Sequence, residues 1–277
     1  MERPLFSERR GTGGPVVVCL HGLAGSGRYW YRVAGRLAGA RLQLQLVDLL
    51  GFGCSPWPDV PYTVDEHLAA LDGWRAAAGL AHEPLVLVGH SLGALLALEW
   101  MACTPEIEGA VLIGLPVYED SDEARRRLAR LSLLHRLTLA APPLGRAVCT
   151  VMCHSRPLWR VFAPLFVRGF PAEVARDGVL HTRRSFFGTL EHCILGLSFD
   201  HLRRRAVGLG LPLTFVHGTT DDTAPVANVR NLVTGLPRTR LLEIPQGGHD
   251  LPLSSADQVA DAIRRFVSDS RLHTHTT

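Results

Sequence analysis

Residues 85–100 have the sequence LVLVGHSLGALLALEW, which combines three patterns. The run 85–88 is apolar throughout, as is typical of a strand buried on both faces of a parallel sheet. Residues 92–100 are rich in Leu and Ala, which favour a helix. Between them lies Gly89-His90-Ser91-Leu92-Gly93, a G-x-S-x-G turn. The stretch therefore predicts a strand, a tight turn and a helix in direct succession.

This turn is suited to presenting the hydroxyl of Ser91. A serine hydroxyl is a weak nucleophile at neutral pH and must project from the backbone towards a base. Small residues two before and two after the serine let the chain pass closely around it. The helix that follows directs backbone N–H groups at the place where negative charge would develop. We predict that Ser91 is a nucleophile; the alternative is a glycine-rich turn without chemistry.

Candidate partners for such a serine occur later in the chain. In a triad of this kind the order is Ser, then acid, then His. His249 follows an expected strand at 240–244, and Asp221 and Asp222 follow an expected strand at 213–217. The alternatives are a solvated loop histidine and an N-cap carboxylate for the next helix. Order and strand-end position favour a triad, while spacing leaves both aspartates open.

The chain resembles the serine-dependent α/β-hydrolases with a lid inserted in the second half of the sheet, and the resemblance covers nearly the whole sequence. Besides the G-x-S-x-G turn, the motifs that carry it are VVVCLHGLAGS at 16–26, DLLGFGCS at 48–55, GTTDDTAP at 218–225 and QGGH at 246–249. The resemblance implies an α/β fold with a mostly parallel, doubly wound sheet and an inserted helical cap.

The resemblance also implies roles for individual residues. It assigns the acid to Asp221 and leaves Asp222 as the alternative. It assigns the oxyanion hole to the backbone N–H groups of Leu23 and Leu92. No metal and no organic cofactor is required by this arrangement.

The reaction expected from these residues is acyl transfer to water. His249 takes the proton of Ser91, Ser91 attacks a carbonyl, and Asp221 orients the imidazole. An ester or thioester is the expected substrate, and a carbon–carbon bond beside a ketone is open to the same triad. Dehalogenases and epoxide hydrolases of this fold carry an aspartate where this chain has Ser91, which argues against both.

Two other classes of function remain open. One is a non-hydrolytic lyase or cyclase of secondary metabolism that uses the same site, since fold does not fix reaction. The other is a non-catalytic binding protein on this fold, although all three candidate triad residues are present.

Strand-like and helix-like segments alternate, which predicts a parallel sheet with helices on both faces. The expected strands are 16–20, 42–47, 85–88, 110–113, 213–217 and 240–244. The expected helices are 29–37, 64–78, 92–103, 226–234 and 256–267. The expected organisation is a main domain of residues 1–116 and 211–270, a helical cap of residues 117–210, and a disordered tail of residues 271–277.

The cap is suspected to hold the substrate-binding residues, because it contains many apolar side chains for an apolar acyl or polyketide-like pocket. Most of those side chains are expected to pack within the cap or against the main domain. The arginine runs at 125–127 and 203–205 are interpreted as solvated helix faces. An anionic acyl carrier or a carboxylate substrate is the alternative partner for them.

Composition excludes several other functions. All 29 basic residues are arginine, so lysine-based Schiff-base and pyridoxal phosphate chemistry is excluded. A net charge of +3 is too small to favour nucleic acid binding. Residues 1–10 have no apolar core typical of a secretory signal. The apolar stretch 131–151 contains charged residues and prolines, which argue against a membrane span.

Six cysteines are scattered along the chain, which indicates free thiols in a reducing compartment and predicts a cytoplasmic protein. Cys149 and Cys153 are one helical turn apart and next to His154. We interpret the two cysteines as small apolar side chains, since a metal site would need more ligands at suitable spacing.

Overall fold

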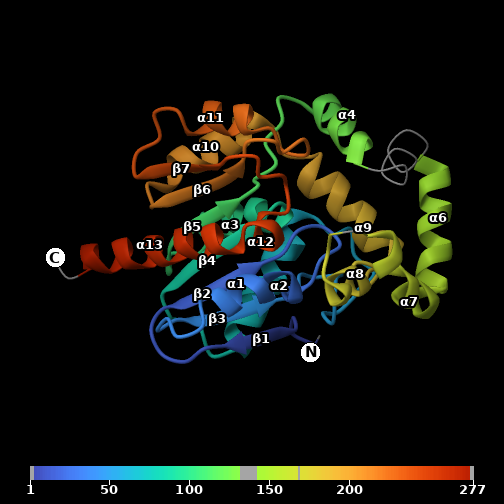
Figure 1. The fold of residues 1–277 in the computed structure, drawn as a ribbon, viewed down its shortest axis with the longest axis horizontal. Helices are drawn as coiled ribbons and strands as arrows, with labels where there is room; N and C mark the ends of the chain where they lie inside the picture. Colours follow the sequence, from blue (N-terminus) through green and yellow to red (C-terminus); the bar gives the residue numbers. More distant parts are fainter. Residues whose placement is uncertain (1–2, 132–141, 168, 275–277) are drawn as a thin grey trace.

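The computed structural model describes residues 3–131, 142–167 and 169–274 (Figure 1). Its sheet has seven strands in the order β1-β3-β2-β4-β5-β6-β7. The strands are β1 (Ser7–Arg10), β2 (Val16–Leu20), β3 (Gln43–Val47), β4 (Leu85–His90), β5 (Ile107–Ile113), β6 (Leu213–Gly218) and β7 (Thr239–Ile244). Strand β1 is antiparallel to β3, and all other neighbours are parallel. The mostly parallel, doubly wound α/β fold predicted from the sequence is confirmed.

Helices follow nearly every strand. Those of the first half are η1 (Gly27–Trp30), α1 (Tyr31–Arg36), α2 (Val64–Ala77) and α3 (Leu92–Met101). Between β5 and β6 lie α4 (Ser121–Leu131), α6 (Pro142–His154), α7 (Arg156–Phe166), α8 (Ala172–Asp177), α9 (Arg183–Thr189), η2 (Leu190–Ile194) and α10 (Phe199–Leu209). The chain ends with α11 (Val226–Val233), α12 (Leu251–Ser254) and α13 (Ala256–Thr274).

Two apolar cores lie on opposite faces of the sheet. Helices α1, α12 and α13 cover one face, where Trp30 and Ile263 are fully buried. Helices α2, α3, α10 and α11 cover the other face, where Trp100 and Leu71 are fully buried. Apolar strands covered on both faces are what a parallel sheet requires, and this explains why the strands were recognisable as apolar runs.

The structure differs from the expected elements at both ends of the chain. Strand β1 was not predicted, because its sequence Ser-Glu-Arg-Arg lacks apolar residues. It joins the sheet edge through backbone pairing, with Ser7 opposite Val47. Helix α13 continues to Thr274, into the segment expected as a tail; residues 275–277 lie outside the described residues.

The segment 117–210 divides into helices that pack on the sheet and helices that stand beyond it (Figure 1). Helix α10 packs on α3, with Leu202 buried in the core. His201 and Arg205 of α10 lie 2.7 and 2.8 Å from the carboxylate of Glu99 on α3. Helices α4 and α6–α8 lie beyond one end of the sheet. Residues 132–141 of the expected cap lie outside the described residues.

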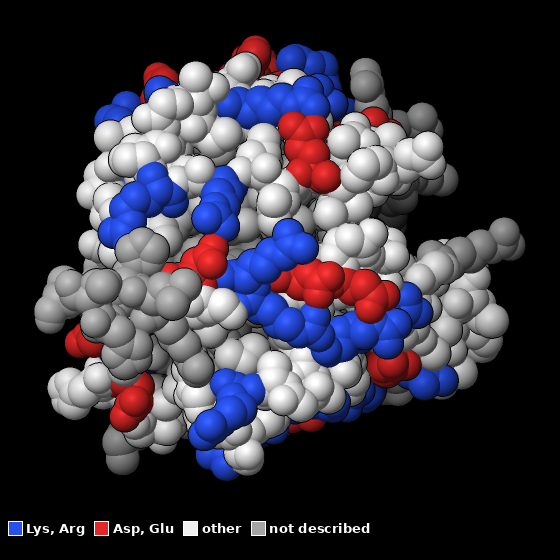
Figure 2. Space-filling view, turned by 60° about the vertical axis from the view of Figure 1, so that its left-hand side comes forward, with Lys and Arg blue, Asp and Glu red and all other residues white. Residues whose placement is uncertain are grey.

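Charged side chains of both signs lie next to each other on the face shown in Figure 2. Among the ion pairs of the described residues, Arg230 lies 2.5 Å from Glu243, and Arg240 lies 2.7 Å from Asp269. Within the described residues, no helix combines the length and apolarity needed to cross a membrane.

The loop after β3 is organised around the carboxylate of Asp48. Its Oδ1 accepts a hydrogen bond from the N–H of Gly27 at 2.6 Å, and its Oδ2 accepts one from the N–H of Cys54 at 2.7 Å. Gly53 has a φ of +56°, and a Cβ there would lie 2.2 Å from Asp48 Oδ2. The glycine of the loop motif is therefore required by backbone conformation and by space.

Gly53→Ala is expected to destabilise the protein by about 2–4 kcal/mol, because an unfavourable φ and a clash with a hydrogen-bonded carboxylate act together. Gly210 is a matched control, since it has a φ of +60° but nothing within 4 Å of its Cβ position. Gly210→Ala should lower the free energy of unfolding by only about 1 kcal/mol. Urea denaturation followed by circular dichroism compares the two, and equal losses would show that the contact with Asp48 does not matter.

Candidate active site

Ser91 lies at the sharp turn between β4 and α3. Its φ of 52° and ψ of −116° are rarely adopted by residues other than glycine, so the surrounding chain must hold this conformation. A Cβ on Gly89 would lie 2.3 Å from the carbonyl oxygen of Gly93, and one on Gly93 would lie 2.2 Å from that of Leu20. Both glycines are therefore required by close backbone approach, and they hold Ser91 at the carboxyl end of β4.

His249 and Asp221 meet directly. The Nδ1–H of His249 donates a hydrogen bond to Oδ2 of Asp221 at 2.8 Å. The other carboxylate oxygen of Asp221 accepts from the backbone N–H groups of Thr223 and Ala224 at 2.9 and 2.8 Å. The Asp221 side chain is fully buried, whereas Asp222 is exposed. Of the two aspartates that spacing left open, the structure places Asp221 against the histidine.

The loop that carries His249 is anchored beside the nucleophile turn. The ring of His90, the residue before Ser91, forms a 3.0 Å hydrogen bond between its Nε2 and the carbonyl oxygen of His249. The rings of His90 and His249 have centroids 4.9 Å apart. In the described residues there is no hydrogen bond between Ser91 Oγ and His249. In enzymes without bound substrate such bonds often tighten only in the complex.

His90 and Tyr29 support the candidate site, and neither role was predicted from the sequence. Burial and the neighbouring His249 lower the pKa of His90 to about 3, so its ring is neutral and its Nε2–H donates to the carbonyl. The ring of Tyr29 stacks on His90 at 4.8 Å, and its hydroxyl donates to Asp250 Oδ1 at 2.9 Å. His90 was visible inside the G-x-S-x-G motif, whereas nothing in the sequence connects Tyr29 to it.

Backbone N–H groups surround the nucleophile on two sides. Leu92 is the first residue of α3, so its N–H precedes the first intrahelical hydrogen bond. The loop containing Gly22 and Leu23 passes beside the serine, since a Cβ on Gly22 would lie 3.4 Å from Ser91 Cβ. Both predicted oxyanion donors therefore belong to segments adjacent to Ser91.

His21 fixes the conformation of this loop. It is fully buried, its Nδ1–H donates to the carbonyl of Gly22 at 2.7 Å, and its Nε2 accepts the N–H of Leu49 at 2.9 Å. Burial lowers the pKa of His21. A neutral ring with one donor and one acceptor is what these two partners need.

The electrostatics of the pair favour a basic histidine. Burial by itself would lower the pKa of His249, but the hydrogen bond and the charge of Asp221 outweigh it and raise the pKa above its ordinary value. Burial would raise the pKa of Asp221, and the hydrogen bond from His249 reverses this and lowers it. The arrangement can therefore accept a proton from a hydroxyl at the ring and stabilise the resulting imidazolium.

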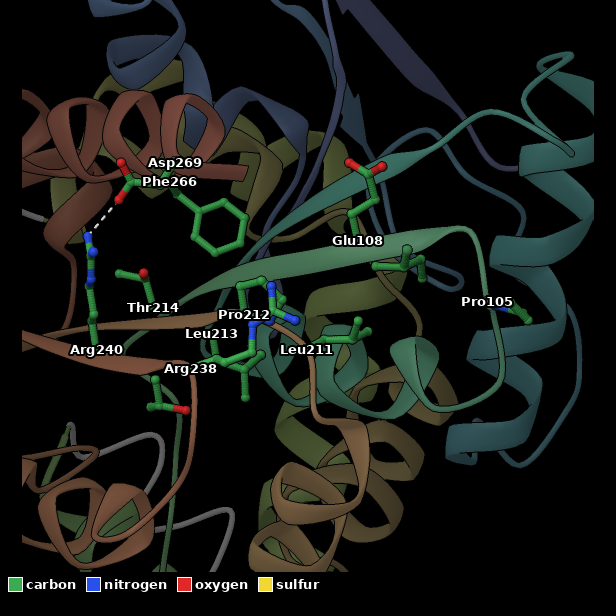
Figure 3. A pocket seen from close by; sticks show the side chains of 12 residues that line it. Pro105, Glu108, Leu211, Pro212, Leu213, Thr214, Arg238, Arg240, Phe266 and Asp269 are labelled. Carbon is green, nitrogen blue, oxygen red and sulfur yellow. Dashed lines mark hydrogen bonds and ion pairs between the residues drawn. The ribbon is translucent and has the colours of Figure 1, made fainter. Parts of the chain in front are cut away.

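A cavity in the described part of the chain lies away from these residues (Figure 3). It has a volume of about 560 Å³ and is lined by the first residues of three strands, Ile107, Leu213 and Thr239, and by Phe266 of α13. Ser91 follows the opposite, carboxyl end of β4. This cavity therefore does not belong to the candidate site.

The two arginine runs differ in what they contact. In α10, Arg203 donates to the carbonyl oxygen of Leu232 at 2.8 Å, so it joins two elements. In α4, Arg127 pairs with Glu123 at 2.7 Å, whereas Arg125 and Arg126 are exposed. The interpretation of the runs as solvated faces fits only part of each run.

Comparisons with known proteins agree with this architecture. A family model described as the alpha/beta hydrolase fold matches residues 15–256. A pimeloyl-[acyl-carrier protein] methyl ester esterase of Xanthomonas campestris pv. campestris (strain B100) is 33% identical over 272 residues, which cover 92% of this chain and 96% of that protein.

Solved structures give the same fold. A bromoperoxidase from Bacillus anthracis superposes with a TM-score of 0.73 at 20% identity and covers 95% of each chain. A thermophilic esterase from Thermogutta terrifontis superposes with a TM-score of 0.69 at 22% identity, covering 96% of this chain and 93% of its own. At these identities the two structures are informative about the fold alone. From the family model and the relative, the chain belongs to the α/β hydrolase fold family.

Proposed function

We propose that this enzyme hydrolyses a carboxylic ester or thioester through a triad of Ser91, His249 and Asp221. The observation that carries the proposal is the 2.8 Å hydrogen bond between His249 and a fully buried Asp221, on a loop anchored beside the turn that presents Ser91. If His249 and Asp221 formed only a structural ion pair, the strained backbone conformation of the nearby Ser91 would have no purpose.

The chemistry follows from these positions. The ring Nε2 of His249 accepts the hydroxyl proton as Ser91 Oγ attacks the carbonyl carbon. The N–H groups of Leu92 and Leu23 stabilise the negative oxygen of the tetrahedral intermediate. The histidine then protonates the departing alkoxide or thiolate, leaving an acyl-serine. Water, deprotonated by the same histidine, releases the acid while Asp221 stabilises the imidazolium.

The substrate class rests on the helices between β5 and β6. We infer that these helices, within residues 117–210, form the cap that holds an apolar acyl or polyketide-like group. The Xanthomonas relative is named for an ester attached to an acyl carrier protein. Arg125 and Arg126 are exposed on α4 and would suit an anionic carrier of that kind.

The six cysteines are free, which supports our placement of the enzyme in the cytoplasm.

A panel of p-nitrophenyl esters of increasing acyl length tests the reaction. The wild-type enzyme is expected to hydrolyse at least one ester, and Ser91→Ala should lower kcat by roughly 10⁴–10⁶-fold without loss of folding. A fluorophosphonate should label Ser91, and Ser155→Ala should serve as an active control. A variant without Ser91 that keeps a tenth of the activity would refute the acyl-serine. Turnover of none of the esters would favour a lyase, a cyclase or a binding protein.

The identity of the acid is tested by two amide substitutions. Asp221→Asn should lower kcat by about 10⁴-fold, since the amide loses the charge that stabilises the imidazolium. Asp222→Asn, at the adjacent exposed position, is the matched control and should change kcat less than about threefold. Steady-state kinetics of both variants show which aspartate is the acid. A larger loss of kcat from Asp222→Asn would reverse the assignment.

The pH dependence tests the base. His249 must be neutral to accept a proton, so kcat/KM should rise with unit slope and then level. Since Asp221 raises the pKa of His249, the midpoint should lie above about 6.5, the value of an ordinary histidine. In Asp221→Asn the residual activity should show a midpoint at lower pH, because the raising charge is gone. A rate highest in acid would instead point to an imidazolium acid and to elimination.

A further inference from the structure

Outside the catalytic site, two cysteines and a histidine converge at helix α6. Cys149 and Cys153 are four residues apart, so they lie on the same face of the helix, one turn apart. Their Sγ atoms are separated by 3.9 Å. His181, from the segment between α8 and α9, completes the group: one ligand atom from each of the three residues lies within 4.8 Å of the other two. His154, the neighbour in sequence, instead hydrogen-bonds Thr150.

The spacing of the sulfur atoms fits tetrahedral coordination. Zinc–sulfur bonds of about 2.3 Å and zinc–nitrogen bonds of about 2.0–2.1 Å place two sulfur ligands about 3.8 Å apart and a sulfur and a nitrogen about 3.6 Å apart. The observed separation of Cys149 and Cys153 already matches the first value. A disulfide needs about 2.05 Å between the sulfurs, so the helix would have to distort to form one.

His181 is held in the way that metal-binding histidines are held. Its Nδ1–H donates to the carbonyl of Thr182 at 3.1 Å, which leaves the lone pair on Nε2. Its backbone forms a β-bridge with Phe52, and its carbonyl accepts from Arg156 Nη2 at 2.7 Å. The same carbonyl oxygen lies 3.6 Å from the Sγ of Cys153.

Helices α6 and α7, which surround this group, have few buried side chains to hold them against the rest of the protein. In α7 the buried side chain is Ala163 alone, while Leu158, Leu165 and Phe166 are exposed by 57%, 69% and 72%. Along residues 143–154 of α6, every residue except Gly145 is half-buried or exposed. A bond that joins α6 to the segment of His181 would supply stability that apolar packing does not.

We propose that Cys149, Cys153 and His181 bind a thiophilic divalent ion such as Zn²⁺ and that the ion fastens α6 to the segment bridged to Phe52. The two thiols lose their protons to solvent on binding, so two thiolates and a neutral imidazole surround the ion. Water occupies the fourth position, as in zinc sites with three protein ligands. The ion joins two segments of the chain, and no step of ester hydrolysis passes through it.

The test uses the full chain, reduced with a phosphine and freed of metal by a chelator. Co²⁺ should bind at one equivalent with a thiolate-to-cobalt charge-transfer band, and Zn²⁺ should displace it. Cys153→Ser and Cys149→Ser should each weaken binding by at least about 10²-fold. Cys103→Ser, which removes an exposed thiol elsewhere, should bind as the wild type does.

Two measurements on the unsubstituted protein keep the result independent of variant folding. Zn²⁺ should protect Cys149 and Cys153, but not Cys54 and Cys103, from iodoacetamide in peptide mapping. It should also raise Tm, with kcat/KM unchanged well below the melting range. The proposal is wrong if the charge-transfer band is absent, if Cys153→Ser binds as tightly as the wild type, or if protection spreads over all thiols. Failure of any of these leaves the ester hydrolase proposal untouched.

Discussion

Close backbone contact at the turn between β4 and α3 is the constraint on which the site depends. Gly93 passes so near the carbonyl of Leu20 that no side chain fits between them, and Gly89 is equally close to Gly93. These contacts hold Ser91 in a conformation that it would not adopt in a free chain. They also fix α3 against β2, so the helix that supplies the N–H of Leu92 and the loop that carries Leu23 are brought to the same point.

Apolar runs and turn residues were sufficient to predict six of the seven strands and the order of their helices. Strand β1 was missed because backbone pairing at a sheet edge leaves no apolar pattern in the sequence. At the candidate site, motif and order predicted Ser91 and His249, but spacing could not separate Asp221 from its neighbour. Which aspartate contacts His249 depends on which carboxylate the loop directs into the protein. Only the folded chain shows this, through the burial and the hydrogen bonds of Asp221.

Contacts between distant segments explain the other residues that sequence analysis missed. Tyr29 reaches the site because η1 packs beside α12, and its ring covers His90. His181 reaches Cys153 because the segment before α9 bridges to Phe52. In both cases the sequence shows the residue but not its contact partner. The contact joins two segments far apart in the chain, and no local sequence pattern predicts such a contact. The two cysteines one turn apart became informative only when the structure placed His181 beside them.

The helices between β5 and β6 differ in how strongly they are held to the rest of the protein. At α8, the buried carboxylate of Asp177 accepts a 2.8 Å hydrogen bond from the hydroxyl of Ser26 in the loop beside the nucleophile. At α9, Thr189 bonds the buried ring of His67 at 3.0 Å. Helices α6 and α7 have few buried side chains and expose apolar ones. Segments with few buried contacts open at low free energy. Without a bound ion, α6 and α7 are therefore expected to open more readily than α8, which is tied to the loop containing Ser26, and α9, which is tied to α2.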